Sequence, residues 1–329
     1  MNGVVLASDG RKVAPREAYG DALVELGELR PDVVVLDADV ANSTFTERFG
    51  RRFPDRFFNL GLCEAHMIGV AAGLARCGRI PYASTFAIFA AQRALNQIFQ
   101  SVAYAQLPVR IVVTHAGITV GEDGATHQTI DDIAILRAMP GMTVIVPSDA
   151  TQTREVVFGV CDHPGPVYVR LGRPATPVLY ERCPFRVGQA YVLREGTDVT
   201  LVGCGIGTWL CLEAARILLE KGISAEVIDS PTIKPLDRTT IVASARRTGA
   251  VVTVEEHSIL GGLGGAVAEL LAEEYPVPVR RVGVRDQFGQ SGKWDELLAH
   301  YGLVPERVAG EAEALLEGRA REVAQWTSW

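Results

Sequence analysis

The chain has 329 residues, of which 48% are hydrophobic, and a net charge of −7 at pH 7. It is too long for one ordinary core, so two domains of about 150 residues each are expected. The acidic balance, without a lysine and arginine cluster, argues against nucleic acid or an anionic membrane as a partner. Six scattered cysteines without a CxxC pair are typical of free thiols. With no signal-peptide pattern and no apolar stretch of roughly 20 residues, a cytoplasmic protein is expected.

Strand and helix patterns alternate along both halves, which predicts α/β domains built on parallel sheets. Short apolar runs without alternation are typical of parallel strands, because both of their faces are buried. In the first half, strands are expected at 33–36, 80–83, 109–113, 143–146 and 167–170, and helices at 16–26, 64–76, 91–105 and 151–160. In the second half, strands are expected at 200–202, 225–228, 251–254 and 280–284, and helices at 209–221, 239–246, 265–274 and 294–300. Glycine and prolines predict a break between 172 and 184.

The most informative segment is the polar loop from Val120 to Gln128, which reads Val-Gly-Glu-Asp-Gly-Ala-Thr-His-Gln. It follows the apolar strand at 109–113 and precedes a helix expected from Asp131, and catalytic groups are often found in such loops. An isolated Asp-Gly pair would be a solvated turn. The concentration of carboxylates, imidazole, hydroxyl and amide within nine residues favours a functional loop.

Glu64 stands at the start of an apolar, glycine-rich helix and has two possible roles. It can complement the helix dipole, which is worth about 0.3–1 kcal/mol, or it can be a buried acid that shares a proton with a ligand nitrogen. Phe86 and Phe89 also have two interpretations. Their helical spacing favours packing in the core, but an aromatic pair at the end of a strand can also stack on a planar heterocycle.

His115, Asp123 and His127 are candidates for ligand binding. Their spacing matches no metal-ligand signature, so no metal site is expected in this chain. Imidazole and carboxylate groups suit a hydroxyl-rich substrate, because they donate and accept hydrogen bonds along a carbon chain.

Three arginines, Arg16, Arg170 and Arg173, are candidates for binding a phosphate, because the guanidinium fork matches its geometry. Taken singly, such arginines more often form surface ion pairs. The segment 203–208 follows a strand and superficially resembles a dinucleotide fingerprint. Its pattern is GxGxG rather than GxGxxG, however, and only Asp229 stands near the end of the next strand as an acidic partner.

Taken together, these residues resemble the transketolase family, in the form of the carboxy-terminal half that occurs as the separate smaller subunit of split transketolases. The resemblance covers nearly the whole chain, from residue 16 to residue 292. Its motifs lie at 36–40, 61–73, 84–86, 121–128 and 147–149. It implies a thiamine-diphosphate-binding domain of the pyrimidine type at residues 1–178, followed by a Rossmann-like transketolase carboxy-terminal domain at residues 186–329.

The resemblance also implies roles for individual residues. Glu64, expected to bond the aminopyrimidine ring nitrogen, and His127 are the expected catalytic residues. The residues expected at the cofactor are Asp39, Glu64, Phe86, Phe89 and Gln92. The residues expected at a sugar-phosphate substrate are Arg16, Ser43, His115, Asp123, His127 and Arg173. Gln92 departs from the pattern, since many full-length transketolases carry a third aromatic residue there.

One part of the family's active site is missing from the sequence. Family members bind the diphosphate through Mg²⁺ with a Gly-Asp-Gly and a downstream asparagine, and this sequence contains no Gly-Asp-Gly. A diphosphate without its metal and anchoring donors would bind poorly. The resemblance therefore implies an obligate N-terminal transketolase subunit that carries the diphosphate-binding domain and the Mg²⁺, in an α2β2 assembly.

The expected activity is that of a two-component transketolase, which moves a two-carbon ketol unit from a ketose phosphate to an aldose phosphate. A 2-oxoacid dehydrogenase β-subunit shares the two-domain plan, but the phosphate-type arginines argue against it. A 1-deoxy-D-xylulose-5-phosphate synthase half shares the Asp-Gly-x-Thr-His-Gln pattern, but that enzyme normally occurs as one fused chain. A non-enzyme that only regulates its partner is the last alternative, and the joint presence of Glu64, Asp123 and His127 argues against it.

Overall fold

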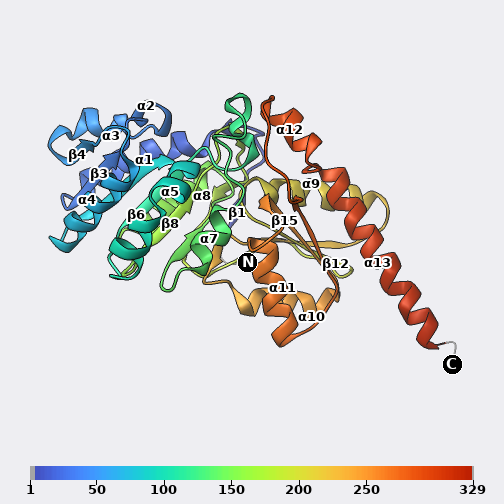
Figure 1. Cartoon of the computed structure of the whole chain (residues 1–329). Helices are drawn as coiled ribbons and strands as arrows, with labels where there is room; N and C mark the ends of the chain where they lie inside the picture. Colours follow the sequence, from blue (N-terminus) through green and yellow to red (C-terminus); the bar gives the residue numbers. More distant parts are fainter. Residues whose placement is uncertain (1–3, 328–329) are drawn as a thin grey trace.

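The structure, a computed structural model, describes residues 4–327 and contains two main sheets that lie side by side (Figure 1). The first has seven strands and the second has five. In sheet order, the first consists of β14 (Thr232–Lys234), β7 (Thr143–Ile145), β8 (Val167–Arg170), β6 (Arg110–Thr114), β5 (Ile80–Phe86), β3 (Val33–Asp37) and β4 (Phe57–Asn59). The second consists of β11 (Tyr191–Arg194), β13 (Ala225–Asp229), β12 (Val199–Gly203), β15 (Val251–Ser258) and β16 (Val279–Val284). The predicted α/β class is confirmed.

The strands of the first sheet are parallel from β7 to β4. β14 is the exception, since it pairs antiparallel with β7 although it comes from the second half of the chain. It thereby covers the backbone groups that β7 would otherwise expose at the sheet edge. The sequence did not predict that a strand from the second half of the chain would join the sheet of the first half.

Alternate strand residues of the first sheet face two helical layers. Val33 and Val35 pack with α1 (Pro15–Leu29), α3 (Glu47–Arg52) and α8 (Ala150–Gly159). Val34 and Leu36 face the opposite layer. That layer consists of α4 (Glu64–Arg76), α5 (Ala87–Arg93), α6 (Leu95–Gln97), the π-helical turn η2 (Ile98–Ala103) and α7 (Asp132–Ala138).

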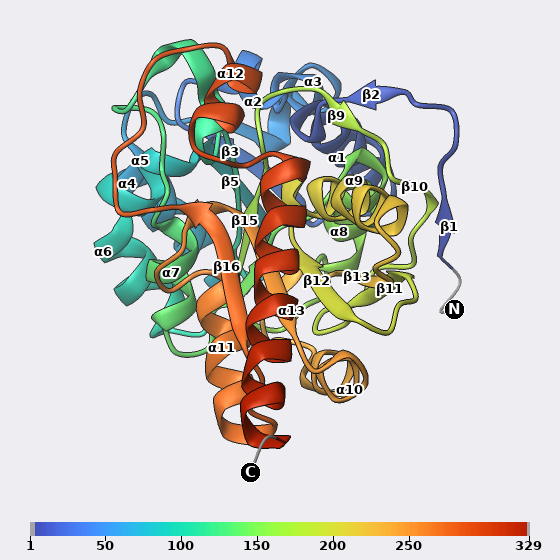
Figure 2. The same cartoon turned by 90° about the vertical axis from the view of Figure 1, so that its right-hand side faces the viewer.

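The second sheet is also covered on both faces. α9 (Ile206–Glu220) and α13 (Pro305–Thr327) cover one face, and α13 runs along the outside of the molecule beside β16 (Figure 2). α10 (Arg238–Thr248) and α11 (Leu263–Glu274) cover the other face and join the core cluster of α4 and α7. One hydrophobic core therefore continues from the first sheet to the second. No helix within residues 4–327 is both long enough and apolar enough to cross a bilayer.

The helix predicted at 91–105 is confirmed in type but not in its bounds or continuity. Helix α5 starts earlier, at Ala87, and ends at Arg93, and the chain then bends at Ala94 into α6 and η2. The expected break at 172–184 contains two short strands, β9 (Thr176–Pro177) and β10 (Tyr180–Arg182), which pair with β2 (Lys12–Val13) and β1 (Val5–Leu6). The other short elements are α2 (Ala41–Thr44), η1 (Pro54–Arg56), η3 (Ile118–Asp123) and α12 (Trp294–His300). The domain boundaries at 178 and 186 stay a prediction.

The glycines at 203–208 are explained by close packing. Gly207 lies in the first turn of α9, and a Cβ atom there would come within 2.3 Å of the carbonyl oxygen of Val254. Asp229 is not available to a dinucleotide, because both of its carboxylate oxygens accept hydrogen bonds. The four donors are Ser148, Gln152, Tyr180 and Thr208.

Gly207→Ala is accordingly expected to lower the free energy of unfolding by about 1–3 kcal/mol, because the backbone of β15 must move to admit the methyl group. Gly310→Ala is the matched control, since a Cβ atom at Gly310 in α13 meets open space. It should gain about 0.5–1 kcal/mol from helix propensity. Thermal and urea denaturation measure both variants, and equal stabilities would contradict the packing argument.

Candidate active site

The expected site residues gather at one edge of the first sheet. Asp39 follows β3, Phe86 ends β5, His115 follows β6 and Arg173 follows β8, while Glu64 begins the helix after β4. These five strands are neighbours and run parallel, so their carboxyl ends meet at the same edge. Ligands of open parallel α/β sheets bind outside the carboxyl ends of the strands.

Four rings form a cluster at this edge. The ring of Phe86 stacks on that of Phe89, with centroids 5.6 Å apart and planes 13° apart, and on the imidazole of His115 at 3.8 Å. The imidazole of His127 meets Phe89 edge-on at 5.5 Å. Phe86 is 9% exposed and Phe89 is half-buried, so the pair packs in the core and is partly exposed at its edge.

Glu64 joins this cluster through Arg93. The Glu64 side chain is buried, with 3% of the residue exposed, and its Oε1 accepts a hydrogen bond of 3.2 Å from Nη1 of Arg93. The same guanidinium lies over the ring of Phe89, 4.4 Å from its centroid. Arg93 was not predicted, although its position four residues after Phe89 on a helix places the two on one face. Gln92 points elsewhere and donates to Asp131 at 3.0 Å.

His115 is held as a neutral imidazole. Its pKa is lowered to about 3, chiefly by burial and in addition by the positive charges of Arg16 and Arg173 and by His127. Its Nδ1 lies 2.8 Å from the hydroxyl of Thr114, which leaves Nε2 for another partner.

We therefore expect His115 to bind no proton between pH 8 and pH 5. In the unfolded chain the imidazole of His115 binds a proton near pH 6.5, whereas in the folded chain it does so only near pH 3. The unfolded state is therefore favoured by proton binding as the pH falls from 6.5 to about 3, and the free energy of unfolding decreases over that range. NMR of the histidine ring signals, assigned with His115→Asn, measures the titration directly. An inflection of the His115 signal between pH 5 and pH 7 would contradict the lowered pKa and the buried, neutral imidazole.

Of the four residues that the resemblance places at the sugar phosphate, namely Arg16, Ser43, His115 and Arg173, Arg16 contacts both Ser43 and Arg173. Arg16 donates from Nε to the carbonyl oxygen of Arg173 at 3.0 Å and from Nη1 to that of Ser43 at 2.7 Å. Arg173 in turn donates to the carbonyl oxygen of Val120 and pairs with Glu122 at 3.2 Å. The two guanidiniums therefore lie beside the polar loop and near His115.

Asp39 and Asp123 lie at the exposed rim of the site. Asp39 has a φ of 63° and accepts a hydrogen bond of 2.9 Å from Asn59, while Asp123 ends the η3 turn. His127 sits between rim and cluster, with its Nδ1 3.0 Å from the hydroxyl of Thr126. Within the described part of the chain, no three histidine, cysteine, aspartate or glutamate side chains are grouped so as to hold a metal ion.

The interpretation of Arg170 as a phosphate ligand is wrong. Arg170 is buried, its Nε pairs with the carboxylate of Asp132 at 3.0 and 3.1 Å, and its Nη2 donates to the carbonyl oxygen of Glu256 at 2.9 Å. The donors on Nε and Nη2 are thus engaged inside the protein. Glu256 belongs to the second sheet and was not predicted to be near the site.

Two family models match most of the chain. Residues 11–178 match the pyrimidine-binding domain of transketolase, and residues 188–308 match the transketolase C-terminal domain.

Similar proteins match over nearly their whole length. The putative transketolase C-terminal section of Methanocaldococcus jannaschii is 49% identical over 298 residues, covering 89% of this chain and 93% of that protein. The 6-deoxy-6-sulfo-D-fructose transketolase subunit SqwH of Clostridium sp. is 44% identical over 303 residues, covering 92% and 94%. A solved split-gene transketolase, an inactive β4 tetramer, is 50% identical with a TM-score of 0.85, covering 93% of this chain and 99% of that one.

Proposed function

The chain belongs to the transketolase family and is the smaller subunit of a split transketolase, which transfers ketol units. On this basis we propose that it shares thiamine diphosphate with a partner subunit. The partner is the N-terminal subunit, which holds the diphosphate and the Mg²⁺, and the assembly is α2β2. The absence of a Gly-Asp-Gly from the sequence supports this division. The solved relative formed only of β chains is inactive, which also supports the need for a partner.

The observation that carries the proposal is the continuous contact from Glu64 through Arg93 to Phe89 and Phe86. It places a buried carboxylate next to flat apolar rings, a combination that fits an aminopyrimidine. When bound, the cofactor supplies the carbanion stabilisation needed for ketol transfer. Glu64 holds the proton that is shared at the pyrimidine ring nitrogen, and Phe86 and Phe89 bind the ring. Asp39 completes the cofactor contacts from the rim, whereas the side-chain amide of Gln92, also expected at the cofactor, donates to Asp131 instead.

The substrate is a sugar phosphate. Arg16, Ser43 and Arg173 bind its phosphate, and Asp123 and neutral His115 bond its hydroxyl groups. His127 moves a proton at a substrate oxygen, for which its Nε2 is free because Thr126 engages Nδ1.

The test is reconstitution with the diphosphate-domain subunit in the presence of thiamine diphosphate and Mg²⁺. Transfer of a two-carbon unit from a ketose phosphate to an aldose phosphate is expected only in the mixture. Product formation from pyruvate and glyceraldehyde phosphate instead would identify a 1-deoxy-D-xylulose-5-phosphate synthase half. Decarboxylation of a 2-oxoacid alone would identify a dehydrogenase subunit, and full activity of the partner without this chain would reject the proposal.

A further inference from the structure

Glu256 of the second domain holds the active-site segment 117–131, which contains the polar loop 120–128 and is called the 117–131 loop below. Glu256 lies in β15, is buried, and its Oε1 accepts a hydrogen bond of 2.7 Å from the backbone N–H of Thr119. Gly117 permits this approach, because its φ is +77° and a Cβ atom there would lie 2.2 Å from the same carboxylate oxygen. A residue with a side chain at 117 would therefore separate the loop from Glu256.

Two backbone hydrogen bonds hold the ends of the loop, one between its two ends and one to β15. The N–H of Gly117 donates to the carbonyl oxygen of Thr129 at 3.0 Å, and the N–H of Ser258, also in β15, donates to that of Ile130 at 2.7 Å. Glu256 and Ser258 thus bond the entry and the exit of one loop. Between these ends the loop carries Asp123 and His127.

The second domain also covers the middle of the loop. The side-chain amide of Gln128 donates to the carbonyl oxygen of Gln290 at 3.0 Å, and Gly124 packs against Ser291. Helix α12 lies against the η3 turn. The loop therefore has few positions at which it can move without breaking a contact to the second domain.

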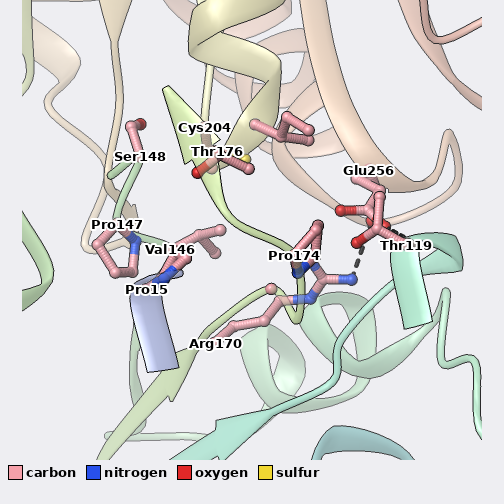
Figure 3. A pocket seen from close by; sticks show the side chains of 13 residues that line it. Pro15, Thr119, Val146, Pro147, Ser148, Arg170, Pro174, Thr176, Cys204 and Glu256 are labelled. Atoms are coloured by element: carbon pink, nitrogen blue, oxygen red, sulfur yellow. Dashed lines mark hydrogen bonds between the residues drawn. The ribbon is translucent and has the colours of Figure 1, made fainter. Parts of the chain in front are cut away.

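Glu256 does not face space large enough for a substrate. The cavity beside it is lined by residues of both domains, among them Thr119 and Arg170 from the first and Glu256 and Cys204 from the second (Figure 3). Its free volume of about 20 Å³ suffices for one water molecule. Glu256 therefore contacts the loop, through Thr119, and the buried Arg170, but it does not line a space that a substrate could enter.

We propose that Glu256 is a positioning residue of the second domain, which holds the 117–131 loop so that Asp123 and His127 face the substrate. The catalytic part of this inference rests on the proposed transketolase function, whereas its structural part does not. Without the carboxylate, the N–H of Thr119 loses its buried acceptor and the entry of the loop is released.

Hydrogen exchange of the full chain tests the structural part without any activity. Glu256→Ala is expected to speed exchange of the segment 117–131 by about tenfold, because the loop opens locally. Glu255→Ala is the matched control. Glu255 is the preceding buried residue of β15, and it accepts hydrogen bonds from the N–H groups of Leu263 and Gly264. The control variant should speed hydrogen exchange at the start of α11 and leave the exchange rate of the 117–131 loop at the wild-type value.

Kinetics of the reconstituted enzyme test the catalytic part. Glu256→Ala should lower kcat by about 10- to 100-fold, since small misplacements of reacting groups have effects of this size. The affinity for thiamine diphosphate should stay unchanged. Glu256→Gln should recover most of the rate because its amide oxygen still accepts from Thr119, and it replaces the alanine variant if that variant does not fold.

Wild-type exchange of the loop in Glu256→Ala, or in Glu256→Gln if alanine does not fold, would overturn the proposal. So would equal losses of kcat in the Glu256 and Glu255 variants, which would show a general effect on stability. If the wild-type complex transfers no ketol unit, the proposed function fails, and the hydrogen-exchange result still decides whether Glu256 holds the loop.

Discussion

Glu64→Ala is expected to reduce the turnover of the reconstituted enzyme by about 10²- to 10⁴-fold, the usual contribution of a positioned acid or base. The reason is the place of this carboxylate, which is buried at the start of α4 and linked through Arg93 to the ring cluster. Removing it leaves nothing to hold the proton at the pyrimidine nitrogen. Steady-state assay of the complex at saturating cofactor measures the loss.

Two further variants separate this role from a structural one. Glu64→Gln keeps the size of the side chain and an oxygen for Arg93, but it cannot hold the shared proton, so it should be nearly as inactive as the alanine variant. Arg93→Met breaks the ion pair and leaves the carboxylate in place, so it should retain much more activity. Wild-type turnover in Glu64→Ala would contradict the role assigned to this residue.

Arg170→Met is expected to lower the free energy of unfolding by about 3–5 kcal/mol, because it leaves Asp132 as a buried carboxylate without its partner. The two side chains are 4% and 0% exposed. The replacement also removes the hydrogen bond that Arg170 donates to the carbonyl oxygen of Glu256. Chemical denaturation of the chain, followed by circular dichroism, measures the change.

The matched control is Arg154→Met, which breaks the ion pair between Arg154 and Glu25. These side chains are 46% and 49% exposed, so the loss should stay below about 1 kcal/mol. The double variant Arg170→Met with Asp132→Leu removes both buried charges and should recover most of the stability. Similar losses for the buried and the exposed arginine would contradict the account of this ion pair.

The sequence predicted the fold where apolar runs are long. Helix α4 begins at Glu64, and α12 spans 294–300, as expected. The short strands β9 and β14 were missed, because neither contains a run of apolar residues. The helix predicted at 91–105 was given as one continuous helix because its apolar spacing continues through Ala94, and the bend there is visible only in the backbone geometry.

The site was predictable in part. The strand assignments, combined with the carboxyl-edge rule, place Asp39, Phe86 and His115 at one edge of the sheet. Glu256 was not predictable, because it is 137 residues from Thr119 in the chain and its contact depends on how the two domains pack. Arg170 was wrongly predicted to bind a phosphate, since the sequence alone does not distinguish an arginine that binds phosphate from one in a buried ion pair.

Calorimetric titration of thiamine diphosphate with Mg²⁺ tests the central claim most directly. It is made on this chain alone, on the candidate diphosphate-domain partner alone, and on their mixture. The shared-site account predicts tight binding only in the mixture, with one cofactor for each pair of subunits. Tight binding to this chain alone would mean that it holds a complete diphosphate site, and the division of the cofactor between two subunits would be wrong.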